Sequence, residues 1–156
     1  MAWGDTDMLR GMLRLDPGLA TSVGAFGFQP MQLQDLCFEV EILDLLLANG
    51  AGIDSTNDEG MTILHLVTDP DAVPILAARG ADLEARDQRG RTPPIAATMG
   101  QENGPNVVIS LLEAGADQAA RSQDRKTGLD IARMPGGDPE FLRVPEGVPE
   151  EVLEGR

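Results

Sequence analysis

The chain has 156 residues, of which 42 % are hydrophobic and only 3 % aromatic, and its formal net charge is −14. This composition excludes a disordered chain and favours one domain with an aliphatic core on packed helices. The charge would repel nucleic acid or an anionic membrane at long range, so the partner we expect is a protein, and a basic one suits the charge. An acidic surface can also serve solubility alone.

The compartment is suggested by the cysteine count and by the N-terminus. Cys37 is the single cysteine, so no intrachain disulfide can form and a reducing compartment is expected. The opening stretch, MAWGDTDMLRGMLRLD, has acids where a signal peptide has basic residues. The most hydrophobic segment, ILDLLLANGAGI, is broken by polar residues and is too short to span a bilayer. We expect a cytoplasmic monomer.

The first expected element is a helix over residues 5–16. Its apolar side chains recur at helical spacing, and they are Met8, Leu9, Met12, Leu13 and Leu15. It would cap the N-terminal end of the stack of repeats that follows.

Four mutually similar stretches come next in the chain. GFQPMQLQ, GMTILHLV, GRTPPIAA and RKTGLDIA start at residues 27, 60, 90 and 125, and their third positions are Gln29, Thr62, Thr92 and Thr127. Between them lie Gly-Ala pairs that start at Gly50, Gly80 and Gly115. The two markers keep the same phase along the chain, which indicates an internal repeat.

Each repeat predicts a pair of helices. Thr92 reads as an N-cap that accepts a hydrogen bond from the first turn, and Pro93 suits the first helical position. A second helix then ends at a glycine in the left-handed conformation, such as Gly80, and a polar turn follows. One such unit cannot bury its apolar face alone, so the units must stack.

This pattern resembles the ankyrin repeat over residues 24–133. The family signature, D-x-x-G-x-T-P-L-H-x-A with a later L-L-x-x-G-A-D, is matched by Asp87, Gly90, Thr92, Pro93, Ala96, Leu111, Leu112, Gly115, Ala116 and Asp117. The resemblance implies an all-α solenoid of stacked helix pairs with extended turns, about four repeats and the capping helix. We expect this domain to cover residues 1–144, and residues 145–156 to form a flexible acidic tail.

Three departures from the family pattern carry predictions. Unit 2 lacks about three residues, and Pro70 and Pro74 predict a shortened first helix there. Unit 3 has a longer internal loop, and Arg125 stands where the turn glycine of unit 4 belongs. A short last helix is expected over 138–144.

His65 is the only histidine of the chain. The resemblance makes it an internal strut that bonds to Thr62 and to the backbone of a neighbouring turn. Gln32 would imitate it in unit 1, whereas Ile95 and Asp130 predict weaker joints. The structural residues are therefore expected to be Thr62, His65, Gly80, Thr92, Pro93 and Gly115.

Catalytic and metal sites are poorly supported by the sequence. A Cys37–His65 pair would place the two residues too far apart in the repeat register, and no nucleophile elbow surrounds any serine. Zinc needs more histidine and cysteine ligands than the chain has, and the acidic clusters lack the order of an EF-hand. We expect no cofactor and no metal.

The resemblance places partner binding on the concave face, formed by turn tips and first helices. The contact residues would be Phe26, Phe28, Asp58, Glu59, Met61, Gln88, Arg89, Arg91 and Lys126. Phe26 and Phe28 suit anchors because aromatic side chains dominate interface energies. They could equally cover the capping helix.

The function expected is therefore a non-catalytic protein–protein interaction module. One alternative is an immunity or inhibitor protein that neutralises a basic toxin or enzyme, which the acidity favours. An alternative of another class is a hydrolase that uses a carboxylate pair on the concave face. A regulatory domain cut from a longer chain is a third, although Met1 and the loose tail favour a whole protein.

Overall fold

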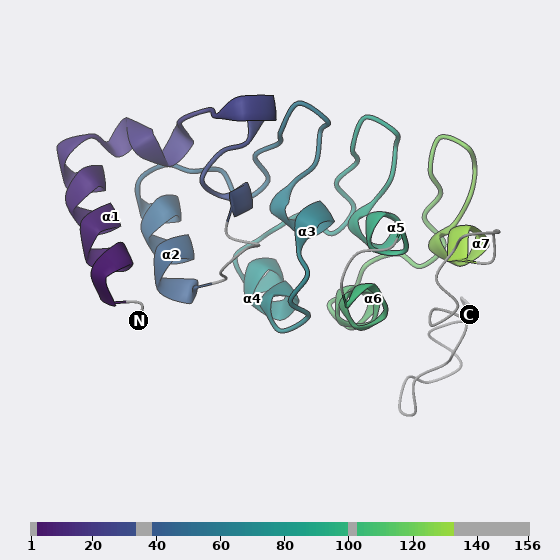
Figure 1. Cartoon of the computed structure of the whole chain (residues 1–156). Helices are drawn as coiled ribbons and strands as arrows, with labels where there is room; N and C mark the ends of the chain where they lie inside the picture. The colour runs from purple at the N-terminus through teal and green to yellow at the C-terminus, as the bar shows by residue number, and fades with distance from the viewer. Residues whose placement is uncertain (1–2, 34–38, 100–102, 133–156) are drawn as a thin grey trace.

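The computed structural model describes residues 3–33, 39–99 and 103–132 (Figure 1). Every regular element in these ranges is a helix, which confirms the predicted all-α class. The elements are α1 (Trp3–Leu15), the 3-10 helices η1 (Pro17–Thr21) and η2 (Ala25–Gly27), α2 (Val40–Ala48), α3 (Ile63–Leu66), α4 (Ala72–Ala78), α5 (Pro93–Ala97), α6 (Gly104–Glu113) and α7 (Gly128–Ala132).

The helices stack in two rows, and a row of extended turns rises above them (Figure 1). We number the units 1 to 4 along the chain. Unit 1 contains η2 and α2, unit 2 contains α3 and α4, unit 3 contains α5 and α6, and unit 4 contains α7. First helices contact first helices, since α5 packs on both α3 and α7, and second helices do the same where α4 packs on α6. At the N-terminal end α1 packs on η1 and α2. The chain is thus a solenoid in which each unit contacts mainly its neighbours.

One leucine in each second helix sits at the centre of the core. Leu46, Leu76 and Leu111 are at most 1 % exposed and occupy the same position of units 1, 2 and 3. The sequence period therefore becomes a column of buried leucines, because the same helix face of every unit meets its neighbour.

The carbonyls of the same leucines also accept the hydrogen bonds that end the second helices. The N–H of the residue after the glycine returns to this carbonyl at 3.0–3.2 Å, in the pairs Ala51–Leu46, Ala81–Leu76 and Ala116–Leu111. Gly80 has φ +87° at the end of α4 and bonds to Ala77, which completes a Schellman motif. The predicted glycine stops are therefore present in all three units.

Two predictions about the first helices have different outcomes. The shortened first helix of unit 2 is confirmed, because α3 has 4 residues and ends before Pro70. The predicted cap bond of Thr92 is wrong: Thr92 occupies the N-cap position before Pro93, but its side chain makes no cap hydrogen bond. The helices expected after Gln29 and over 138–144, and the tail 145–156, lie wholly or largely outside the described residues.

The glycine stop of α4 gives a stability test. A Cβ at Gly80 would meet no atom within 4 Å, so only the left-handed backbone opposes a side chain there. We expect Gly80→Val to lower the free energy of unfolding by about 1–3 kcal/mol. Gly80→Asn is the matched control and should cost much less, because asparagine tolerates this conformation. Equal denaturation midpoints for wild type and Gly80→Val would show that the conformation carries no such constraint.

Candidate partner-binding surface

The four turns form one edge of the molecule, which we call the rim: residues 24–28, 57–61, 87–91 and 122–126. Each turn is closed by a hydrogen bond from its first N–H to its last carbonyl. The bonds are 2.7 Å for Gly24–Phe28, 3.1 Å for Asn57–Met61, 3.1 Å for Asp87–Arg91 and 2.9 Å for Ser122–Lys126. The tips thus have a defined shape and project their side chains from a fixed backbone.

Backbone hydrogen bonds also tie each tip to the next. The N–H groups of Asp58, Gln88 and Gln123 donate to the carbonyls of Phe26, Glu59 and Arg89 at 3.0, 2.9 and 3.2 Å. Two side-chain amides add to these links between tips: Gln88 donates to the Asp58 carbonyl at 2.6 Å, and Gln123 donates to the Gln88 carbonyl at 2.8 Å. Gln88, a predicted partner contact, is therefore also a structural link of the rim.

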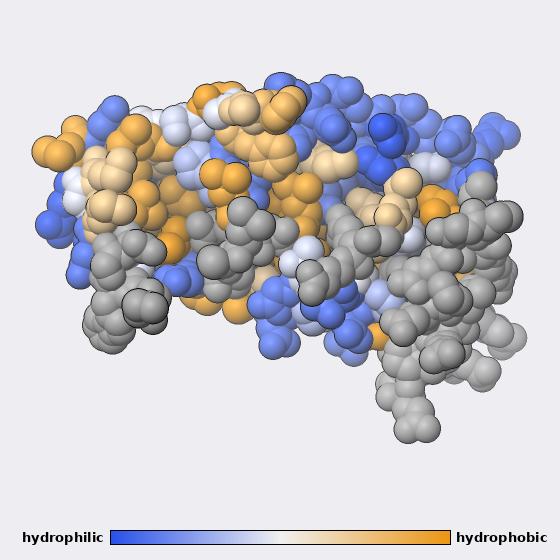
Figure 2. All heavy atoms as spheres, in the orientation of Figure 1, coloured by the Kyte–Doolittle hydropathy of each residue, from blue (hydrophilic) through white to orange (hydrophobic). Residues whose placement is uncertain are grey.

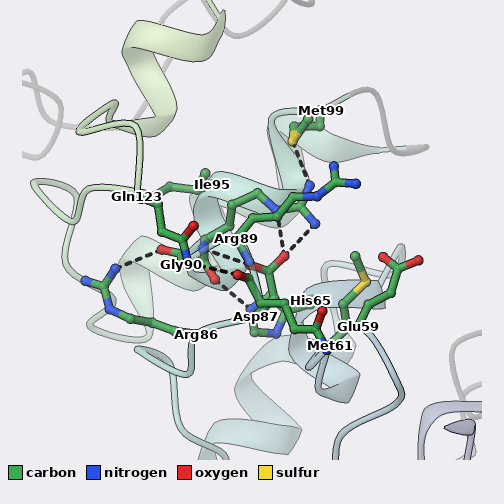
Figure 3. A network of polar contacts seen from close by, with 12 residues as sticks. Glu59, Met61, His65, Arg86, Asp87, Arg89, Gly90, Ile95, Met99 and Gln123 are labelled. Carbon is green, nitrogen blue, oxygen red and sulfur yellow. Dashed lines mark hydrogen bonds and ion pairs between the residues drawn. The ribbon is translucent and has the colours of Figure 1, made fainter.

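His65 joins the first helix of unit 2 to the turn of unit 3. Its Nε2 lies 2.9 Å from the carbonyl oxygen of Arg91, which can only accept, so Nε2 carries the proton. Nδ1 is then the acceptor for the Thr62 N–H at 3.2 Å and for the Thr62 hydroxyl at 2.9 Å. These are the two contacts that the family resemblance implies for this histidine. Figure 3 shows His65 below the Asp87 network.

The neutral ring is the form that the site accommodates. Burial lowers the pKa of His65 below its usual value, and the hydrogen bond to the Arg91 carbonyl opposes this only in part. Protonation would also place a second N–H at Nδ1, facing the Thr62 N–H. The charged ring would therefore lose a hydrogen bond as well as its hydration.

The lowered pKa makes stability depend on pH. Below about pH 6.5 the unfolded chain binds a proton at His65 more readily than the folded chain does, so the stabilisation is present above that pH and declines below it. From pH 7.5 to 5.5 we expect a loss of up to about 1.4 kcal/mol. His65→Gln should flatten the profile over this range in chemical denaturation. An unchanged slope in that variant would assign the pH dependence elsewhere.

Other residues occupy the histidine position in the remaining units. In unit 1 the Gln32 amide accepts from the Gln29 N–H at 2.7 Å, as His65 does from Thr62. It donates to the Ser55 carbonyl at 2.6 Å, so it also links two units, but through a carbonyl at a different repeat position from Arg91. In unit 4 the Asp130 carboxylate accepts from the Thr127 N–H at 2.9 Å. Unit 3 has Ile95, and there the hydroxyl of Thr92 is buried without a hydrogen-bond partner.

The two buried threonines should therefore respond in opposite directions to the same substitution. Thr62→Val removes a hydroxyl bonded to His65 and should cost about 1 kcal/mol, because Nδ1 loses one donor. Thr92→Val removes an unpaired buried hydroxyl and should raise the free energy of unfolding by about 1 kcal/mol. Urea denaturation of both variants gives the sign of each change in the free energy of unfolding. Destabilisation by both would mean that the Thr92 hydroxyl has a partner.

Arg91 is not available for a partner, contrary to its prediction as a contact residue. Its side chain folds back on Asp87, with Nε 2.6 Å from one carboxylate oxygen, and the two residues are 8 % and 5 % exposed. Burial by itself would raise the pKa of Asp87, but the hydrogen bonds from Arg91 and Arg89 and the charge of Arg91 lower it. Arg91 also donates to the thioether of Met99 at 3.0 Å (Figure 3).

The other predicted contact residues lie on the rim with different exposure. Asp58, Glu59, Gln88 and Arg89 are exposed, while Phe28, Met61 and Lys126 are half-buried. Phe26 is 79 % exposed, so it does not cover the capping helix. The rim thus changes along its length from aromatic through acidic to mixed polar.

Sequence reasoning missed two apolar side chains on the side of the first helices. Leu33 and Met99 are each 52 % exposed, and Leu66, at the same repeat position as Leu33, is half-buried. For Leu33 the repeat offered a signal: units 1 and 2 have a leucine at this position, where unit 3 has the smaller Ala96. Figure 2 shows apolar surface gathered over the first units and hydrophilic surface along the tips of the later ones.

The described residues offer little to the hydrolase alternative. Among them Asp87 is the one fully buried acid, and its partner is Arg91 rather than a second carboxylate. No group of three or more histidine, cysteine, aspartate or glutamate residues within these ranges is arranged to hold a metal ion. None of the described helices is long and apolar enough to cross a membrane.

Two comparisons with known proteins agree with this geometry. A family model described as ankyrin repeats (3 copies) matches residues 36–132, a range that contains α2 to α7. The nuclear factor NF-kappa-B p105 subunit of Gallus gallus is 33 % identical over 98 residues, which is 59 % of this chain and 10 % of that protein. The chain therefore spans about a tenth of the length of this relative.

Proposed function

The chain belongs to the ankyrin-repeat family, whose repeats are protein–protein interaction modules, and we propose that it binds a partner protein without catalysis. The proposed surface is the rim together with the row of first helices, which is the concave side in this family. Supporting this, Leu33 and Met99 are half exposed in the first-helix segments of units 1 and 3, and Asp58 and Glu59 are exposed on the tip of unit 2. Exposed apolar side chains rimmed by charge are typical of a docking surface.

The charge supports a basic partner. The net charge is −14, and opposite charges speed association and select among partners. Inhibition of a basic toxin or enzyme is a narrower form of this proposal and rests on the same observation. The single cysteine suits a reducing compartment such as the cytoplasm, where we expect the protein to act as a monomer.

Affinity capture with paired variants tests the surface. Leu33→Glu places a charge on the first-helix side, and Ala78→Glu places the same charge at an exposed position of the second helix α4. We expect Leu33→Glu to release the captured partner and Ala78→Glu to retain it, with both variants folded by circular dichroism. Retention by both variants, or release by both, would contradict the proposed surface.

Calorimetry with the recovered partner then tests the charge. A basic partner should bind more weakly as salt is raised from 50 to 500 mM, because screening shortens the reach of the negative charges of the chain. If the partner is an enzyme, its activity should fall to a minimum at a stoichiometric ratio. Binding that is independent of salt would contradict a basic partner.

A further inference from the structure

The tip of unit 1 holds an aromatic residue in a disfavoured backbone conformation. Phe26 has φ +58° and ψ +25°, in the left-handed region that bulky side chains rarely adopt. The described non-glycine residues with positive φ are Phe26, Asn103 and Arg125, and of these only asparagine suits the region. At the same tip position units 2 and 3 have Glu59 and Arg89, which do not have positive φ. The repeat itself therefore does not require this conformation.

Contacts on both sides prevent the tip from relaxing. The Gly24 N–H donates to the Phe28 carbonyl at 2.7 Å, and the Asp58 N–H donates to the Phe26 carbonyl at 3.0 Å. Gly27 has φ +74°, and a Cβ there would collide with Asp58. The next turn thus packs directly on the tip and holds the ring of Phe26 outward.

The folded chain gains little from this ring. Phe26 is 79 % exposed, and Val23 nearby is 68 % exposed, so apolar surface stays in water as well. An asparagine or glycine at this position would relieve both the strained backbone and the exposed apolar area. Strain that the chain does not need for folding is a feature of ligand-binding positions.

The surroundings define the chemistry of a partner. Asp58 and Glu59 stand exposed on the adjacent tip, and the backbone of Asp58 is bonded to that of Phe26. We propose that Phe26, with these two carboxylates, forms an anchor for a basic amphipathic segment of another protein, whose apolar face covers the ring and whose lysine or arginine side chains pair with the carboxylates. This inference rests on the proposed function and specifies which part of the rim selects the partner.

The test uses the full chain and two synthetic helical peptides with the same leucine positions, one with lysine and one with glutamate at all the others. Isothermal calorimetry should show binding of the lysine peptide alone. Phe26→Asn should raise Tm by about 2–4 °C, because it relieves the strain of one left-handed residue in a domain of this size. It should nevertheless weaken binding of the lysine peptide about tenfold or more. The double substitution Asp58→Asn with Glu59→Gln should weaken it and reduce its salt dependence.

Arg125→Gly is the matched control, because Arg125 is the other strained and exposed residue of the rim. It should raise Tm in the same way and leave peptide affinity unchanged. Equal affinity of Phe26→Asn and wild type, equal binding of the two peptides, or binding to zwitterionic vesicles instead would overturn the anchor. If the captured partner is lost with Leu33→Glu but kept by Phe26→Asn, the anchor fails while the proposed function stands.

Discussion

The imidazole of His65 is a buried hydrogen-bonded link between two units, and the geometry of the stack around it depends on such links. One nitrogen accepts from the start of its own helix, and the other donates to the Arg91 carbonyl in the next turn. Because that turn is held by the bond between Asp87 and Arg91, the position of the first helix of unit 2 is transmitted to the rim of unit 3. A polar core network of this kind stabilises only when its members are paired.

The rim separates the task of joining units from the task of recognition. Its tips are connected mainly through backbone groups, as between Asp58 and Phe26 or Gln123 and Arg89. The outward side chains can therefore vary without breaking the hydrogen bonds between tips. This explains how one row of turns can be aromatic at one end and polar at the other. The amides of Gln88 and Gln123 are the exceptions, since they serve as links.

Irregular features are distributed unevenly along the array. Unit 2 has both threonine and histidine in place and compensates for its short first helix with a complete buried link. Unit 3 leaves the Thr92 hydroxyl unpaired, and Arg125 holds the left-handed turn position of unit 4. These two sites lower stability, as expected of proteins that are only marginally stable. Phe26 differs from them because its strained backbone presents a large exposed ring.

Local rules made much of the fold predictable. The repeat period, the glycine stops such as Gly80 and the short helix before Pro70 follow from backbone preferences that act within a few residues. The role of His65 followed from the family pattern rather than from spacing alone. The candidate site was predicted only in outline: the turns were placed correctly along the chain, but the burial of Arg91 was not foreseen.

The sequence by itself determined that the chain is a stack of helix pairs, and that the second helices of units 1 to 3 end at glycines. The tertiary structure alone decided that Arg91 is buried, that the Thr92 hydroxyl has no partner and that Phe26 stands in solvent. Burial and pairing depend on what the neighbouring unit, some thirty residues away, places against a side chain. A pattern with helical or repeat periodicity sets which positions face a neighbour, but not how the two surfaces fit.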